Sequence, residues 1–188
     1  MCFLLFKRSN NVPWSTINRD IHNFSQTMLR IKDPEKSLYF YIHILGMKLI
    51  YVKHNNDFSL YFLKSEYVNN TKNDKIYNFN ELKNGYQSDE NYKQFKSSWE
   101  PVLELTHNHG TEKDENFTYH NGNTEPRGFG HIGFLVNDIE SYCTELKNLN
   151  IPFKKELKDG LMHNIAFIYD PDNYVVELIQ RGTSFDCK

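Results

Sequence analysis

Two apolar segments of the sequence each contain a single glutamate, Glu104 in VLELT and Glu177 in VVELI. Both segments are apolar on the two faces that a strand presents, which is typical of covered strands. A carboxylate that points inward there costs several kcal/mol unless it is paired or binds a metal ion. Two further segments, QTMLRI and HIGFLV, open on Gln26 and His131. These four side chains are therefore candidate metal ligands.

Each of the four residues, taken alone, also fits a role without metal. A strand glutamate is often solvated, a histidine is often hydrogen-bonded in a core, and a glutamine is an ordinary polar strand residue. The occurrence of all four together favours a metal site. Two carboxylates balance a divalent cation, and a nitrogen and oxygen set without thiolate suits Zn²⁺ or Ni²⁺, and also Co²⁺ or Mn²⁺. Four protein ligands on a six-coordinate ion leave two positions for a substrate with adjacent oxygens.

Local signals predict the elements that position the first pair of these residues. QTMLRI is typical of a strand, and Asp33 followed by Pro34 predicts the start of a helix. Apolar residues then recur at helical spacing up to Gly46, which predicts the end of that helix. MKLIYV, FSLYFL and PVLELT predict three further strands.

The same order of signals recurs after Gly130. HIGFLV predicts a strand, Asp138 predicts the cap of a second helix, and Asn150 occupies the position of a helix terminator. PFKKEL, NIAFIY and YVVELI predict three strands, the last two joined by a turn at 170–173. Both halves of the chain therefore have the order βαβββ.

Superposing the two halves places Gln26 on His131 and Glu104 on Glu177. We therefore expect an α+β protein in which two βαβββ modules form curved mixed sheets around a metal site. The segment rich in Asn, Lys, Glu and Tyr is expected to be a solvated insertion with little role in chemistry. The expected divisions are an arm, a first module with that insertion, a connecting loop, a second module and a tail, at 1–24, 25–109 (insertion 64–98), 110–129, 130–180 and 181–188.

Composition limits the class of protein. The formal net charge of −2 gives no electrostatic reason to expect nucleic-acid binding. Three scattered cysteines are too few for a disulfide scaffold or a zinc finger, and Cys143 fits a small core residue. The apolar start of the chain is shorter than a signal-peptide core, and no later stretch approaches a membrane span. We expect a soluble, cytoplasmic protein without membrane partners.

Longer stretches of the sequence resemble one known family. QTMLRIKDPEKSLYFYIHILGMKLI, LELTHN, PRGFGHIG and DPDNYVVELI closely resemble glyoxalase I (lactoylglutathione lyase) of the vicinal-oxygen-chelate superfamily. The resemblance runs from about Gln26 to Ile179. It implies that Gln26, Glu104, His131 and Glu177 are the metal ligands. The arm and the insertion resemble those of the larger eukaryotic-type enzymes, which usually carry zinc.

The resemblance also implies contacts with a glutathione hemithioacetal. Arg30, Asn108 and Arg127 match residues that hold the γ-glutamyl end of glutathione. Lys155 matches a group near the glycyl carboxylate, and Met162 matches a residue that lines that end of the site. Arginine offers a planar fork for carboxylates, so these residue types suit a substrate that is anionic at both ends.

Three features depart from the family pattern. Leu161 stands where zinc-type enzymes commonly have a second lysine for the glycyl carboxylate. His109 stands where a tryptophan is usual, and the turn around 54–57 is shorter. These departures concern glutathione affinity and the shape of the substrate pocket rather than the chemistry.

The implied reaction isomerises the methylglyoxal–glutathione hemithioacetal to S-lactoylglutathione through a metal-bound enediolate. Glu177 is the expected general base, with Glu104 as a ligand that shares the proton handling. In relatives with one pair of modules per chain, the sites are shared in a homodimer. Gln26 and Glu104 would then face His131 of the partner subunit and Glu177 of the partner subunit. The short 107–130 connection leaves closure within one chain open as an alternative.

Two other readings compete with this one. The first is another vicinal-oxygen-chelate enzyme, such as an extradiol dioxygenase, whose iron site would need two histidines and one carboxylate. The second is a non-catalytic binding protein of the same fold. His107, His109 and His120 also suggest a second metal site, but their position in or beside a loop favours structural roles.

Overall fold

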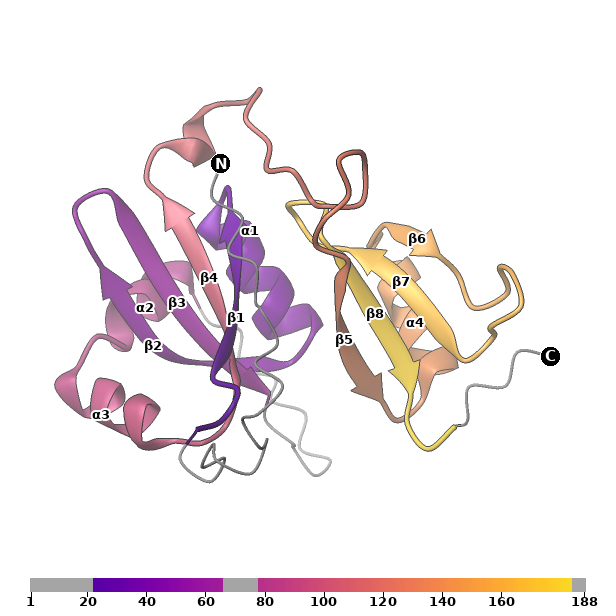
Figure 1. Ribbon diagram of the computed structural model, residues 1–188, viewed down its shortest axis with the longest axis horizontal. Helices are drawn as coiled ribbons and strands as arrows, with labels where there is room; N and C mark the ends of the chain where they lie inside the picture. Colours follow the sequence, from indigo (N-terminus) through magenta and orange to yellow (C-terminus); the bar gives the residue numbers. More distant parts are fainter. Residues whose placement is uncertain (1–21, 66–77, 184–188) are drawn as a thin grey trace, which may run out of the picture.

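The computed structural model describes residues 22–65 and 78–183 as two open four-stranded sheets with their helices (Figure 1). The first module contains β1 (Gln26–Ile31), α1 (Pro34–Leu38), η2 (Tyr39–Ile44), β2 (Met47–His54), β3 (Phe58–Ser65), α2 (Phe79–Gly85), α3 (Asp89–Ser97) and β4 (Val102–Asn108). The short helix η3 (Thr111–Lys113) follows, and the second module contains β5 (His131–Val136), α4 (Ile139–Asn148), β6 (Phe153–Lys155), β7 (Ile165–Tyr169) and β8 (Val175–Gln180).

The two sheets have the same topology. Their strand orders are β1-β4-β3-β2 and β5-β8-β7-β6, and the first and last strands of each module pair in parallel. The remaining neighbours pair antiparallel, so both sheets are mixed. This architecture confirms the α+β fold with two βαβββ modules.

The predicted helix boundaries follow from local chemistry. The Asp33 side chain accepts hydrogen bonds from two backbone N–H groups of the first turn, with Pro34 at the first helical position. The helix continues as the π-helix η2 and stops before Gly46, whose φ of +70° suits a residue without Cβ. Asp138 caps α4 in the same way, and Asn150 has φ +57° after its end. Among the described residues, no helix combines the length and apolar character that a bilayer span requires.

The insertion is more ordered than the sequence predicts. Its described part contains α2 and α3, which bury Leu82 and Phe95. The Phe95 ring lies 4.6 Å from the ring of Phe62 on β3, centroid to centroid. The expectation of a purely solvated excursion is therefore wrong for residues 78–98. Each helix buries one apolar side chain fully, and Phe79 of α2 and Tyr92 of α3 pack beside these as partly exposed rings. Residues 66–77 lie outside the described part of the chain.

One cluster of buried side chains joins the two modules. It includes Tyr41 from the first module and Val176 from the second. Cys143 is buried and unpaired within this cluster, as expected for a small core residue. The Tyr142 hydroxyl on α4 donates a hydrogen bond of 2.5 Å to the carbonyl of Ile44 at the end of η2. The modules therefore share a core, while the sheets do not close around a common site.

Candidate metal centre in two half-sites

The first half-site lies on the parallel pair β1 and β4. Gln26 opens β1, and Glu104 lies in the middle of β4 opposite Met28. The Gln26 amide Nε2 donates to Glu104 Oε2, and the Thr106 hydroxyl donates to Glu104 Oε1 over 3.3 Å. Glu104 is buried, and both donors are neutral groups, so they do not balance its negative charge. A buried carboxylate in this state fits the binding of a cation.

The second half-site lies on the parallel pair β5 and β8. His131 opens β5, and Glu177 lies in β8 opposite Gly133. His131 Nε2 and Glu177 Oε2 are 3.2 Å apart, and the two side chains are 45% and 15% exposed. A Cβ at Gly133 would lie 3.6 Å from Glu177 Oε2, so the glycine leaves space beside the carboxylate.

The two half-sites have the same register. Gln26 pairs with Val102 on β4, and His131 pairs with Val175 on β8. In each sheet the glutamate comes two residues after that valine. The superposition made from the sequence therefore holds for the strand pairing. The equivalence reflects the repeated topology of the two modules rather than any single motif.

The structure does not bring the two pairs together within one chain. Glu104 belongs to the first sheet, whereas His131 and Glu177 belong to the second. Within residues 22–65 and 78–183, no three His, Cys, Asp or Glu side chains form a group that could hold a metal ion. Each chain thus presents two separate half-sites, each with one carboxylate and one neutral donor.

The chemistry of the donors fits a divalent cation when two half-sites meet. Together they supply two carboxylates, one imidazole and one amide oxygen, a set that suits Zn²⁺ and also Ni²⁺, Co²⁺ or Mn²⁺. The Gln26 amide now turns its nitrogen towards Glu104. Rotation of that amide by half a turn directs its oxygen to the same place, as metal binding requires.

The strand faces that carry the ligands are open. Residues two apart in a strand share a face, so Met28 and Arg30 lie on the Gln26 face, and Leu135 lies on the His131 face. Met28 is 42% exposed and Leu135 is 69% exposed. Large apolar side chains on both ligand faces indicate surfaces that another protein surface can cover.

The predicted glutathione contacts lie on three different elements of the first module and the connection. Arg30 is exposed near the end of β1. Asn108 ends β4, and its amide donates to the Tyr119 hydroxyl over 3.1 Å. Arg127 is exposed and forms an ion pair of 3.0 Å with Glu125. None of these contacts tests the predicted role, which stays a prediction.

Lys155 has a well-defined local role in the second module. Its ammonium donates to the carbonyls of Glu156, Met162 and Ile165 over 3.1, 2.7 and 2.9 Å. An ammonium has three N–H donors, so these bonds use all of them. Lys155 therefore organises the loop that contains Met162, and binding a carboxylate would require it to exchange one of these carbonyls.

The histidines near the end of β4 have hydrogen-bond partners instead of a shared centre. His107 Nε2 lies 2.8 Å from Glu112 Oε2, and His109 Nε2 lies 2.8 Å from the Ser59 hydroxyl. Burial lowers the pKa of His107, against the raising influence of the Glu112 carboxylate. His120 accepts a hydrogen bond from the backbone of its own loop. These contacts support structural roles for all three.

Sequence reasoning missed the apolar patch beside Glu104. Phe62 pairs with Glu104 across β3 and β4, and it forms a buried cluster with Val102 and with Phe95 of α3. The end of this cluster lines a cleft of about 410 Å³ between α3 and the sheet. The signal in the sequence was the cap at Ser88, whose hydroxyl accepts from the backbone N–H three residues later.

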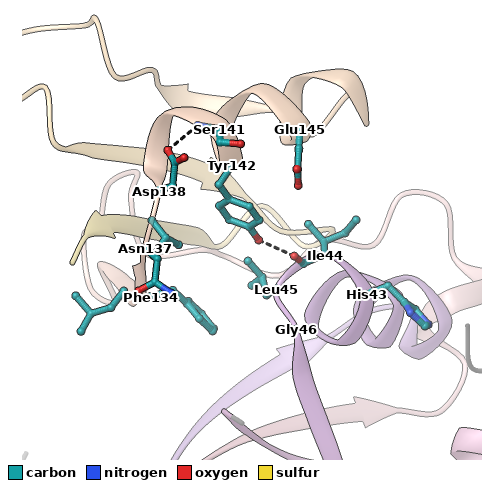
Figure 2. Close-up of a pocket in the computed structure, with 12 residues that line it drawn as sticks. His43, Ile44, Leu45, Gly46, Phe134, Asn137, Asp138, Ser141, Tyr142 and Glu145 are labelled. Carbon is teal, nitrogen blue, oxygen red and sulfur yellow. Dashed lines mark hydrogen bonds between the residues drawn. The ribbon is translucent and has the colours of Figure 1, made fainter. Parts of the chain in front are cut away.

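A second cleft, of about 630 Å³, lies at the junction of the modules (Figure 2). The end of η2 forms one wall, and the end of β5 with the first turns of α4 forms the other. The Tyr142 side chain crosses this cleft to reach the Ile44 carbonyl. The lining residues include none of the four candidate ligands, so this cleft is separate from both half-sites.

Comparisons with known proteins agree with the fold. Residues 23–178 match the model of the Glyoxalase/Bleomycin resistance protein/Dioxygenase superfamily. The chain is 46% identical to a lactoylglutathione lyase of Pseudomonas putida over 159 residues, 84% of each chain. It is 44% identical to a lactoylglutathione lyase of Schizosaccharomyces pombe, covering 89% of this chain but 50% of that one. The structure of a trypanothione-dependent glyoxalase I of Leishmania major is similar, with a TM-score of 0.56, 26% identity, and coverage of 85% and 86% of the two chains.

Proposed function

The chain belongs to the Glyoxalase/Bleomycin resistance protein/Dioxygenase superfamily, and we propose that it is a lactoylglutathione lyase (glyoxalase I) that depends on a divalent metal ion. The observation that carries this proposal is the pair of half-sites at equivalent strand positions, Gln26 with Glu104 and His131 with Glu177. Zn²⁺ is the proposed metal, with Ni²⁺, Co²⁺ and Mn²⁺ as alternatives that the same donors accept.

We propose that two chains complete each metal centre. The four ligands do not meet within a chain, and the strand faces that carry them are open. In a two-fold dimer, Gln26 and Glu104 of one chain would meet His131 of the partner subunit and Glu177 of the partner subunit. The symmetry then produces two identical centres from four half-sites.

The substrate of this reaction carries a C–H group next to a carbonyl, which is too weak an acid to ionise unaided at neutral pH. When bound, the metal would stabilise the developing negative charge on the substrate oxygens as a Lewis acid. Glu177 removes the proton from that carbon and returns a proton to the neighbouring carbon. Its side chain keeps 15% exposure, and the absence of a Cβ at Gly133 leaves space beside the carboxylate, so it can move between these two positions.

The remaining residues orient the glutathione part of the substrate. Arg30 and Arg127 are exposed cations that suit the anionic γ-glutamyl end, and Asn108 adds an amide at the end of β4. We propose that Lys155 and Met162 contact the glycyl end of glutathione. The Lys155 ammonium donates to the Met162 carbonyl and so holds the loop that contains Met162.

The direct test is turnover of the methylglyoxal–glutathione hemithioacetal by chelator-treated protein and by protein reconstituted with each metal. We expect the chelated protein to be inactive and Zn²⁺ or another divalent ion to restore S-lactoylglutathione formation. Absence of turnover with every metal, in protein that remains folded, would contradict the proposed function.

A further inference from the structure

The junction of the two modules contains a buried carboxylate that one module supplies to the other. Asp170, in the turn before β8, accepts a hydrogen bond of 2.8 Å from the Tyr41 hydroxyl of η2 through Oδ2. Its other oxygen accepts from the backbone N–H groups of Asp172 and Tyr174 over 2.9 and 2.8 Å. Tyr41 is completely buried and Asp170 is 3% exposed. The carboxylate thus links the turn to the first module without contact with solvent.

A second carboxylate of the same turn makes a parallel link. Asp172 Oδ1 accepts from the backbone N–H of Lys32 over 2.9 Å, and its Oδ2 accepts from the Ser37 hydroxyl over 3.3 Å. Asp172 is 8% exposed. We call the group formed by Lys32, Ser37, Tyr41, Asp170 and Asp172 the junction clamp.

The clamp contains more charge than the turn itself needs. A turn between two antiparallel strands requires only backbone hydrogen bonds and one short polar side chain, and neutral residues supply these. Burial of two carboxylates is costly, and it raises the pKa of Asp170 to about 7. Three of the four carboxylate oxygens accept hydrogen bonds from the first module, and the fourth accepts from the turn itself. The arrangement therefore serves the contact between the modules.

The clamp lies between the strands that carry the two half-sites. Lys32 directly follows β1, the strand that Gln26 opens, and Tyr174 directly precedes β8, the strand that contains Glu177. A displacement at the clamp is therefore transmitted to both ligand-bearing strands over a few residues. On another side of the junction lies the cleft of Figure 2, where the hydrogen bond from Tyr142 to the Ile44 carbonyl also joins the modules.

We infer that Tyr41, Asp170 and Asp172 are positioning residues that set the orientation of one half-site relative to the other. The inference rests on the proposed dimer with shared metal centres. In such a dimer each chain contributes one half-site to each centre, so the angle between the modules decides whether both centres close at once. A loosened clamp misplaces the ligands without removing any of them.

The test is the Tyr41→Phe variant, which removes only the hydroxyl of the link to Asp170. The matched control is Tyr61→Phe, because Tyr61 is 1% exposed and its hydroxyl belongs to the interior of the first module. Affinity for Co²⁺ and Zn²⁺ is measured by competition with a chromophoric chelator, and kcat and KM are measured on the metal-loaded protein.

We expect Tyr41→Phe to weaken metal affinity by about tenfold and to lower kcat with little change in KM, since groups that support metal ligands act on this scale. Tyr61→Phe should keep wild-type metal affinity. Wild-type metal affinity in Tyr41→Phe, or equal losses in both variants, would overturn the inference.

Two additions keep the result decisive. If Tyr41→Phe does not fold, Ser37→Ala loosens the Asp172 link alone, and the same metal titration applies with the same two outcomes.

Chelator competition does not depend on turnover. Wild-type protein that binds metal without isomerising the hemithioacetal would refute the proposed function while the clamp is still tested by affinity. An active wild type with an unchanged Tyr41→Phe affinity would refute the clamp alone.

Discussion

Replacement of Asp170 by Asn should change how the stability of the protein depends on pH. The pKa of Asp170 is raised from 3.8 to about 7, first by burial and then by the nearby Asp172, while hydrogen bonds from Tyr41 and the backbone oppose the shift. The other charged or titratable groups facing this turn include Tyr174, Tyr119, Lys32, Asp33 and Arg30. Asp170→Asn keeps one oxygen for the two backbone N–H groups and places an NH₂ group against the Tyr41 hydroxyl, which can accept. The variant therefore removes the titration with little change in shape.

The direction and the size of this pH effect on stability follow from the linkage between proton binding and folding. An acid whose pKa is raised on folding contributes stability fully below its unfolded pKa, near 4, and loses it as the pH rises through the folded value, near 7. The shift from 3.8 to about 7 corresponds to a total on the order of 4 kcal/mol. Between about pH 5 and about pH 8.5 the wild type should lose roughly 3 kcal/mol relative to Asp170→Asn.

The assay is urea unfolding of both proteins at these two pH values, with the metal removed and the protein concentration fixed. The free-energy difference between variant and wild type is the measured quantity, because other titrating groups cancel in it. From about pH 5 to about pH 8.5, the free energy of unfolding of Asp170→Asn should rise relative to that of the wild type by roughly 3 kcal/mol. A difference that stays constant within about 0.5 kcal/mol would refute the buried, raised Asp170.

Three further substitutions test other parts of the account. Glu177→Gln should lower kcat by several orders of magnitude while changing substrate affinity much less, and a variant with more than a tenth of wild-type kcat would remove Glu177 as the base. Leu161→Lys should lower KM at nearly constant kcat, because Leu161 is exposed and the Lys155 ammonium is committed to carbonyls; a flat or higher KM would show that the glycyl end is elsewhere. Phe95→Ala should destabilise the protein by about 3 kcal/mol in urea unfolding, whereas Tyr92→Ala should cost less than half as much, because the Tyr92 ring is 43% exposed where it packs against Tyr51.

The repeated fold was predictable because its signals are local. Caps at Asp33 and Asp138 and the terminators Gly46 and Asn150 fix the helices through contacts within a few residues. Alternation of apolar residues fixes the strands. The insertion helices were not predictable from periodicity, because Phe95 is the one buried residue of α3, and its partner Phe62 is distant in the sequence.

The equivalent strand positions of the four candidate ligands were predictable, but their arrangement in space was not. The repeat places Gln26 and His131 in equivalent positions, yet it does not say whether the two pairs meet within a chain. The junction clamp could not be predicted from the sequence for a related reason. The segment around Asp170 has the sequence of a tight turn, and its carboxylate is buried where it accepts a hydrogen bond from Tyr41 of the other module. Contacts between modules depend on how the modules pack, which no local pattern records.

The central claim is that two chains share each metal centre, and mixing of complementary variants tests it most directly. One chain carries Gln26→Ala with Glu104→Ala, the other carries His131→Ala with Glu177→Ala, and each is inactive alone. After subunit exchange is verified by mass, about half of the dimers are mixed, and in a shared-site dimer each of these has one intact centre. If two chains share each centre, the mixture should recover roughly a quarter of wild-type activity. Activity that stays at background after verified exchange would contradict shared centres, because centres closed within a chain would all lack two ligands.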